Sequence, residues 1–314
     1  MEQQKFQLFK VRHFTDAIND TLAFAKDYVR QYGYVLLVLV APIYLIGSFV
    51  YSSAMTSFAM STNFMRNLSH MGATSGLGVA GIMIIALGAL VMHLLFISAF
   101  MAVERSEDGR IDHTDILRGM RENAGRMITL YLQIFLISLL LVGVFALFVF
   151  ALVSIHATAL LVLGGLVFFV GVVYVAVPLS FITIVYIREE LPLGAAVSRC
   201  FYLVRHNFWW TLLILFVAGL IGGFAGALFQ VPAMALNFMK TFTSVRSGRL
   251  DFEVGTADRV AMGLSQFGSI VTTTVTAIAT CIQYYSLVEK KDGTTLLQEI
   301  ENIGTDKDSN DFYR

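Results

Sequence analysis

Six long apolar runs constrain the fold of this chain more than any other feature of its sequence. A helix needs about 20 mostly apolar residues to cross roughly 30 Å of hydrocarbon. The runs cover approximately residues 34–58, 77–103, 127–154, 159–187, 209–235 and 260–286. Charged residues make up only 14% of the chain, whereas about a quarter of an ordinary soluble domain is charged. The sequence therefore predicts an all-α, polytopic membrane protein with six transmembrane helices.

Basic residues between the runs predict how the protein is oriented in the membrane. Lysine and arginine concentrate in cytoplasmic segments, and 17 of the 22 basic residues lie in residues 1–33, 104–126, 188–208 and 287–314. The other five are Arg66, Lys240, Arg246, Arg249 and Arg259. Both termini are therefore expected to lie in the cytoplasm.

Charge is missing from the apolar runs themselves, which contain no Asp, Glu, Lys or Arg. Transporters that couple to ions or protons usually carry such residues in the middle of the membrane. The sequence therefore disfavours coupled transport. The zero net charge of the whole chain also gives no indication of a nucleic-acid partner.

A basic, polar stretch joins directly onto an apolar run at three places. The segments "VRQYGYVLLVLVA", "MRENAGRMITLYL" and "VRHNFWWTLLILF" place Arg30, Arg121 and Arg205 in the same register. Upstream of each join, apolar residues recur at steps of three and four, as in a helix with one apolar face. In the first segment these residues are Phe14, Ile18, Leu22, Ala25, Val29 and Tyr32. We call each join an elbow, and expect an amphipathic helix to lie at the cytoplasmic interface and bend there into a span.

The spacing of the elbows predicts three repeats, each an amphipathic interfacial helix followed by a helical hairpin. The repeats cover about residues 14–103, 112–187 and 192–286, and together they form one six-helix transmembrane domain over residues 1–286. Residues 287–314 are predicted to form a cytoplasmic tail with a short amphipathic helix.

The elbows carry side chains that suit the headgroup level of a membrane. Arginine can extend to lipid phosphates, and tryptophan prefers the membrane interface. These side chains either anchor and orient the helices, or form a binding surface for anionic lipid or for a cytoplasmic protein partner. The candidate headgroup contacts are Arg30, Arg121, Arg205, His206, Trp209 and Trp210.

The sixth run is polar along one helical face, and the fifth run is rich in glycine. The polar residues are Ser265, Ser269, Thr272, Thr276, Thr280 and Gln283. The fifth run contains two overlapping G-x-x-x-G patterns, Gly219 with Gly223 and Gly222 with Gly226. Residues of these kinds let two helices pack closely. The same face also suits a wet groove for a polar headgroup or solute, and both interpretations stay open.

The chain shows no motif for catalysis or metal binding. His93 is inside a run, and the other histidines lie on one side of the membrane or the other, so they cannot converge with it on one metal. Asp112, His113 and Asp115 resemble catalytic residue types, but they also suit a helix cap. The G-x-S-x-G, H-E-x-x-H and phosphate-loop motifs are absent. The sequence therefore predicts no enzyme activity, no cofactor and no metal.

The order of amphipathic helix, span and returning hairpin, closed by "QYYSLVEKKDGTTLLQEIENIG" at residues 283–304, resembles a known family. The chain is similar to the six-span membrane proteins common in Bacteroidota, and to the membrane domain fused to some glycerophosphodiester phosphodiesterases. The resemblance implies a protein of the bacterial inner membrane. It does not extend to phosphodiesterase activity, because the soluble barrel and clustered metal-binding carboxylates of that enzyme are missing.

These observations lead to two expectations of function. The first is a non-enzymatic scaffold or accessory subunit of the membrane, which contacts anionic lipid through its interfacial helices. The alternative is an uncoupled facilitator or channel for a lipid or a small polar solute, along the polar face of the sixth run.

Overall fold

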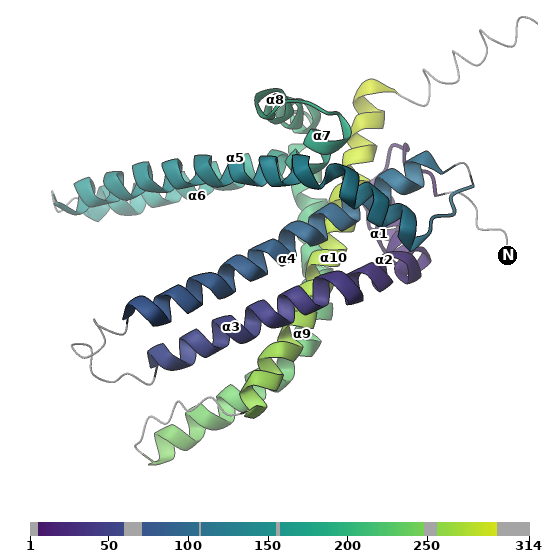
Figure 1. The fold of residues 1–314 in the computed structure, drawn as a ribbon. Helices are drawn as coiled ribbons and strands as arrows, with labels where there is room; N and C mark the ends of the chain where they lie inside the picture. Colours follow the sequence, from purple (N-terminus) through teal and green to yellow (C-terminus); the bar gives the residue numbers. More distant parts are fainter. Residues whose placement is uncertain (1–5, 60–70, 107, 155–157, 248–255, 294–314) are drawn as a thin grey trace, which may run out of the picture.

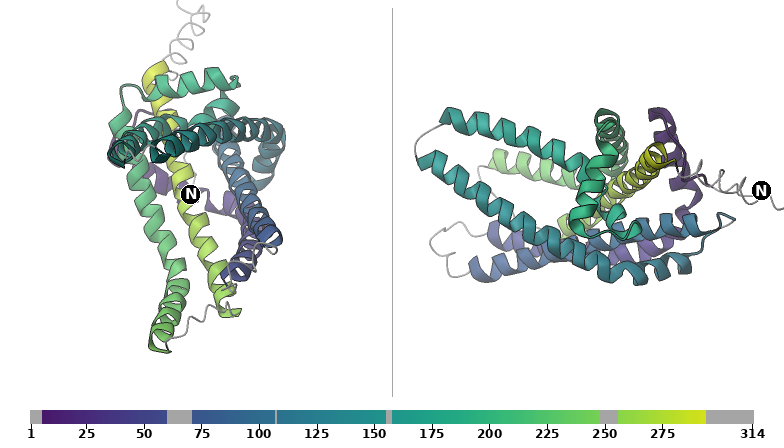
Figure 2. Two further views of the ribbon diagram at one scale, coloured as in Figure 1. Left: turned by 90° about the vertical axis from the view of Figure 1, so that its left-hand side faces the viewer. Right: turned by 90° about the horizontal axis from the view of Figure 1, so that it is seen from above.

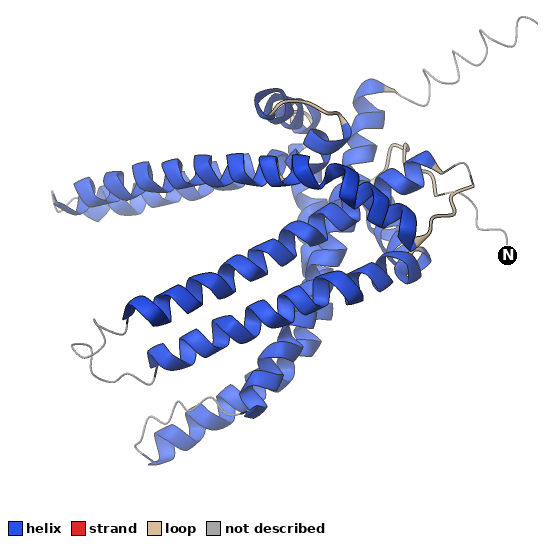
Figure 3. Cartoon of the chain, viewed as in Figure 1, coloured by secondary structure: helices blue, strands red, loops and turns tan. Residues whose placement is uncertain are grey.

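The computed structural model describes residues 6–59, 71–106, 108–154, 158–247 and 256–293. These residues are mostly helical, and no strand occurs among them (Figure 3). The elements are α1 (Phe14–Asp27), α2 (Val29–Val35), the π-helical turn η1 (Leu36–Val40), α3 (Ala41–Ala59), α4 (Met71–Arg105), α5 (His113–Ser154), α6 (Thr158–Leu179), α7 (Ile182–Arg188), α8 (Leu193–Val204), α9 (Phe208–Ser247) and α10 (Thr256–Asp292).

The described residues contain six stretches of helix that are long and apolar enough to cross a membrane. They are Val29–Tyr51, Gly76–Arg105, His113–Phe145, Gly164–Arg188, Phe208–Thr243 and Thr256–Asp292. The prediction of an all-α, multi-pass membrane protein is therefore confirmed. Several helices are longer than the apolar runs that predicted them. For example, α9 continues beyond Pro232 to Ser247, because polar residues end a hydropathy signal without ending a helix.

The long helices form three hairpins, α3 with α4, α5 with α6 and α9 with α10 (Figure 1). The hairpins spread in different directions from a common packed region, as two further views also show (Figure 2). We call this region the hub: it is where α1, α7 and α8 meet the ends of α4 and α10. Away from the hub, large apolar side chains face outward, as with Leu140 at 68% exposure and Phe169 at 67%. Such apolar surfaces are suited to contact with the hydrocarbon of a membrane.

Aromatic side chains from distant parts of the chain fill the hub. The rings of Phe24 and Phe100 are stacked with their centroids 4.1 Å apart. Phe9, from the segment before α1, packs edge-on against Tyr285 of α10 at 5.1 Å. The backbone N–H of Arg12 in the same segment donates to Ser286 Oγ at 3.0 Å. The N-terminal segment is therefore part of the packed core, which the sequence did not predict.

The first and third predicted elbows are interruptions between helices. Only Tyr28 separates α1 from α2, and a short turn separates α8 from α9 after Val204. Both α1 and α8 bury one face, and the buried residues on α1 are Ala17, Thr21 and Phe24. These two amphipathic helices are confirmed as separate elements.

The middle elbow differs from the other two, because no break separates two helices there. Helix α5 is continuous from His113 through Arg121 to Ser154, and its first turns are inclined to the long remainder of the helix (Figure 1). The segment contains no proline, and its residues favour helix, so the backbone hydrogen bonds continue while the hydropathy changes. The three repeats and their boundaries stay a prediction, as does the boundary at residue 286.

Two prolines inside the apolar runs lie beside irregular turns. Pro178 comes just before the end of α6, and α7 begins at Ile182 after a short turn. Pro42 is the second residue of α3, just after the π-helical turn η1. A proline ring removes one helical hydrogen bond and crowds the preceding turn, which suits an irregular turn there.

The C-terminal end of α10 extends further than the predicted span. The helix continues to Asp292, and Gly293 follows with a positive φ of 61°, a conformation that glycine adopts readily at a helix end. The amphipathic helix predicted for the tail falls mostly within residues 294–314, which lie outside the described residues.

Candidate functional site

A network of hydrogen bonds between charged and tyrosine side chains joins the helices of the hub. Arg188 of α7 forms two hydrogen bonds to the carboxylate of Glu104 at the end of α4, at 2.9 and 2.7 Å. Tyr285 OH donates to the same carboxylate at 2.7 Å, and Tyr284 OH donates to Glu189 at 2.7 Å. Because each acid and base has a partner, this network stabilises the hub and leaves no obvious position for a ligand.

Arg199 extends the network to α8. Its guanidinium donates to Glu189 at 2.9 Å and also to Asp292 at the end of α10. Burial disfavours the charged form of Arg199, but the hydrogen bonds to Asp292 and Glu189 outweigh it and raise the pKa of Arg199 above its ordinary value. Arg199 is therefore a permanent cation that holds α8 against α10.

The six predicted headgroup contacts are all exposed. Arg30 lies on α2, Arg121 on α5, and Arg205 with His206 in the turn between α8 and α9. Trp209 and Trp210 begin α9 and are 77% and 60% exposed. The six residues are divided among α2, α5, α9 and the turn before α9, and Trp210 is the one that lines a pocket described below. Whether they bind lipid stays a prediction.

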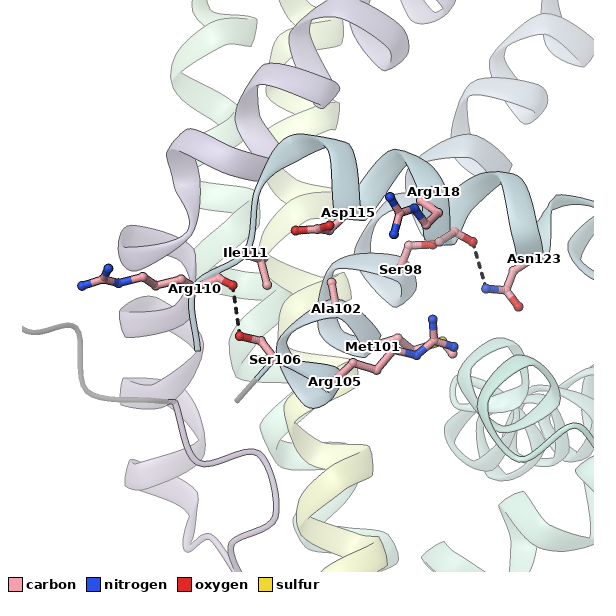
Figure 4. Close-up of a pocket in the computed structure, with 11 residues that line it drawn as sticks. Ser98, Met101, Ala102, Arg105, Ser106, Arg110, Ile111, Asp115, Arg118 and Asn123 are labelled. Carbon is pink, nitrogen blue, oxygen red and sulfur yellow. Dashed lines mark hydrogen bonds between the residues drawn. The ribbon is translucent and has the colours of Figure 1, made fainter. Parts of the chain in front are cut away.

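A pocket of about 300 Å³, which we call the basic pocket, lies between the end of α4 and the first turns of α5 (Figure 4). Arg105 and Arg118 extend beside it from the two helices, while Arg110 is directed away from the other lining residues. Ser98 lies at its base, 1% exposed, and its Oγ has no hydrogen-bond partner among the described residues. The sequence singled out Arg121, one turn beyond Arg118, and missed this pocket.

The charged triplet at the start of α5 forms a helix cap, as its alternative interpretation predicted. Asp112 Oδ1 accepts from the backbone N–H of His113 at 2.8 Å, and the backbone N–H of Asp112 donates to Asp115 Oδ2 at 3.0 Å. The hydrogen bond from the His113 backbone is the main cause that lowers the pKa of the Asp112 carboxyl below its ordinary value. The reciprocal pattern satisfies amides that a helix start leaves open.

A second pocket, of about 400 Å³, lies at the third elbow, and we call it the elbow pocket. It lies between the start of α1, the start of α9 and the last turns of α10. It is lined by Arg12, His13, Phe14, Thr15, Asn207, Trp210, Ile214, Gln283, Ser286, Leu287 and Lys290. Two predicted residues therefore meet here, one from the elbows and one from the polar face of the sixth run.

Polar contacts at the elbow pocket form two levels. At the outer level, Lys290 Nζ donates to Asn207 Oδ1 at 2.7 Å. At the inner level, Gln283 Nε2 donates to Thr211 Oγ1 at 3.3 Å, and Gln283 Oε1 accepts no hydrogen bond from the described residues. Arg12 is already bonded to Asp20 at 2.6 Å and to the carbonyl oxygen of Leu8 at 2.8 Å.

The polar face of α10 does not act as one surface. Thr276 and Thr280 line a cavity of about 180 Å³, which we call the mid-span cavity, together with His93, Ser180 and Thr183. Their hydroxyls are bonded within their own helix: Thr280 Oγ1 donates to the carbonyl oxygen of Thr276 at 2.8 Å. Ser265 likewise donates to the carbonyl oxygen of Met262 at 2.7 Å, and Ser269 is half-buried.

Thr272 instead belongs to the packed contact between α9 and α10. Its Oγ1 donates to the carbonyl oxygen of Gly222 at 2.9 Å. A Cβ atom added to Gly226 would lie 2.5 Å from the carbonyl oxygen of Gly268, so these backbones touch. One of the two predicted glycine patterns, Gly222 with Gly226, therefore packs against α10, whereas Gly223 of the other faces open space.

His93 and the cysteines show no arrangement for metal binding or nucleophilic chemistry. His93 Nδ1 lies 2.8 Å from the carbonyl oxygen of Ala89, one turn earlier in its own helix. No group of three or more His, Cys, Asp or Glu side chains that could hold a metal occurs among the described residues. Cys200 and Cys281 are buried, and burial raises the pKa of the Cys200 thiol to about 12.

A scan against models of protein families, a search of curated proteins and a search of solved structures found no match to this chain. The family resemblance therefore stays a prediction from the sequence.

Proposed function

We propose that this chain is a non-enzymatic scaffold or accessory subunit of a bacterial inner membrane, with both termini in the cytoplasm, and that it contacts anionic lipid through its interfacial helices. The kinship with the six-span Bacteroidota proteins is part of the same proposal and rests on residues 283–304. The protein partner of such a scaffold would be a membrane or cytoplasmic protein.

The observation that carries the proposal is the division of the arginines into two groups. Arg12, Arg188 and Arg199 are bound to carboxylates inside the hub. Arg30, Arg121 and Arg205 are exposed, and no ion pair engages them among the described residues. Basic side chains near a membrane surface attract anionic lipid by about 1 kcal/mol each. Exposed tryptophans beside Arg205 support an interfacial position.

Lipid binding by the purified full chain tests this proposal. Delipidated protein is titrated with phosphatidylglycerol or phosphatidylcholine, and bound lipids are counted by native mass spectrometry. Replacing Arg30, Arg121 and Arg205 together by Gln is expected to weaken phosphatidylglycerol binding about tenfold or more. The matched triple replacement by Lys keeps the charge and should keep the binding. Equal phosphatidylglycerol binding by the Gln variant would contradict the proposal.

The mid-span cavity supports a second candidate, an uncoupled facilitator for a lipid or small polar solute. Hydroxyl side chains of α7, of α10 and of the turn before α7 line this cavity, together with His93 of α4. In liposomes, a facilitator would give glycerol uptake or lipid scrambling that Thr276→Leu abolishes and Thr273→Leu, outside this cavity, preserves. A scaffold would give neither glycerol uptake nor lipid scrambling, so robust flux of either kind would contradict the scaffold interpretation.

A further inference from the structure

The outer end of the elbow pocket is cationic. Lys290 and His13 line it, and no carboxylate is among its lining residues. Helix α1 also begins here, and its N-cap residue His13 makes no side-chain hydrogen bond to the first-turn amides. A helix start with open amides attracts anions. Lys290 has three donors and gives one to Asn207, so two remain for a ligand.

The inner end of the elbow pocket holds a buried amide with an open acceptor. Gln283 is 4% exposed, and its Oε1 has no hydrogen-bond partner among the described residues. A buried carbonyl oxygen is stable only when a donor reaches it. Because Gln283 lines the pocket, a ligand in the pocket is well placed to supply that donor.

The separation of the two ends sets the length of the ligand's polar part. Lys290 is bonded to Asn207, and Gln283 is bonded to Thr211. The backbone N–H of Thr211 donates to the carbonyl oxygen of Asn207 at 2.9 Å, as in one helical turn. One turn rises about 5.4 Å, which a phosphate and a hydroxyl on the same glycerol unit can span.

The walls of the elbow pocket also include apolar side chains. Ile214 and Leu287 are buried at 3% and 2% exposure, and Trp210 is 60% exposed beside them. A hydrocarbon chain attached to the ligand would therefore meet apolar side chains on leaving the polar groups.

We propose that the elbow pocket binds a monoacyl glycerophosphate, with its phosphate at Lys290 and the start of α1 and its free glycerol hydroxyl donating to Gln283 Oε1. In a diacyl lipid that hydroxyl is esterified and offers only acceptors. The inference deepens the proposed lipid contact of the elbows and rests on it for the level of the membrane surface. Unlike that general contact, this proposal requires one discrete site, which prefers a lipid whose glycerol hydroxyl is free to donate a hydrogen bond.

The chain's two tryptophans are adjacent, which gives a direct probe. Trp209→Phe leaves Trp210 at the pocket as the single tryptophan. Emission from this full-length protein in detergent is followed during titration with lysophosphatidic acid, phosphatidic acid or glycerol 3-phosphate. Lysophosphatidic acid is expected to bind saturably and about tenfold more tightly than phosphatidic acid, the difference that one hydrogen bond confers.

Two further substitutions in this background separate the ends of the site. Gln283→Leu should weaken lysophosphatidic acid about tenfold and leave phosphatidic acid unchanged, which abolishes the preference. Lys290→Gln, on an exposed side chain, should weaken both lipids, whereas Lys291→Gln, which does not line the pocket, should weaken neither. Thermal unfolding checks that each variant is folded. If Gln283→Leu does not fold, Lys290→Gln still tests the site, because its side chain is exposed.

Three outcomes would overturn the proposal. Equal affinity for the monoacyl and diacyl lipids would show that no ligand hydroxyl donates to Gln283. Equal affinity for glycerol 3-phosphate and lysophosphatidic acid would indicate a soluble ligand. Unchanged lipid binding by Lys290→Gln would show that Lys290 does not bind the phosphate. Each leaves the phosphatidylglycerol result for the Arg30, Arg121 and Arg205 variant untouched, so failure here differs from failure of the proposed function.

Discussion

Arg188 and Glu104, 84 residues apart in the chain, are joined by two parallel hydrogen bonds in the hub. Their side chains are 18% and 28% exposed, so neither charge is well hydrated without the other. The guanidinium also lies 5.1 Å from the ring centroids of both Phe9 and Tyr285. This single pair thereby connects α4, α7, α10 and the segment before α1.

Removing one member of this pair is expected to destabilise the protein. Arg188→Met leaves the Glu104 carboxylate poorly paired and should lower the free energy of unfolding by about 1–3 kcal/mol. Thermal unfolding in detergent measures the change, with Arg205→Met on an exposed side chain as the control. Combining Arg188→Met with Glu104→Gln should cost less than the sum of the single changes. Simple additivity would show that the pair is not coupled.

The contact between α9 and α10 predicts a sharp difference between two glycines. Gly226→Ala places a Cβ 2.5 Å from the carbonyl oxygen of Gly268, whereas Gly223→Ala meets open space. The first substitution should cost about 1–3 kcal/mol, as overpacking does. The second should leave stability unchanged or slightly raised, since alanine favours helix over glycine. Thermal unfolding of the two variants side by side checks this, and equal midpoints would contradict the close contact.

The cap of α5 predicts a loss of stability in acid. The folded state holds the pKa of Asp112 below its ordinary value. The cap therefore stabilises the fold fully above the unfolded-state pKa and loses this effect as the pH falls through the folded-state pKa. Asp112→Asn can still cap the helix and should flatten that part of the pH dependence. Unfolding midpoints between about pH 6 and pH 3 make the comparison, and parallel curves would refute it.

The predicted orientation can be read from cysteine labelling. Both native cysteines are buried, so they give little background. Arg30→Cys, on the expected cytoplasmic side, should react with an impermeant maleimide in inside-out vesicles and not in right-side-out vesicles. Arg246→Cys should show the opposite pattern. Labelling of both positions from the same side would contradict the positive-inside count.

Sequence pattern predicted the spans well because hydropathy depends on each residue's own chemistry. It also predicted α1 and α8 as separate helices, yet Leu22 and Val29 of the predicted apolar stripe are 45% and 52% exposed. The packed face is offset, with Ala17, Thr21 and Phe24 buried. An interfacial helix borders both protein and lipid, so apolar residues occur on more than one side, and periodicity does not say which side packs.

The middle elbow and the polar face differ from a simple reading of the sequence pattern for different physical reasons. At Arg121 the hydropathy changes, but nothing in the local backbone chemistry stops α5. On α10 one periodic face crosses three environments, so Thr272 contacts a glycine of α9 while Gln283 lines the elbow pocket. The pair of Arg188 with Glu104 depends on how separate hairpins meet, which no local pattern contains.

Helix α9 has 40 residues, which corresponds to about 60 Å of helix axis. Hydrocarbon accounts for about half of that length. A helix of this length extends beyond the hydrocarbon even when it is tilted, and α10 returns beside it. The ion pair of Lys240 with Asp258 lies in this distal part. The α9–α10 hairpin is therefore longer than a membrane span requires, and this ion pair ties its two helices together in the surplus length.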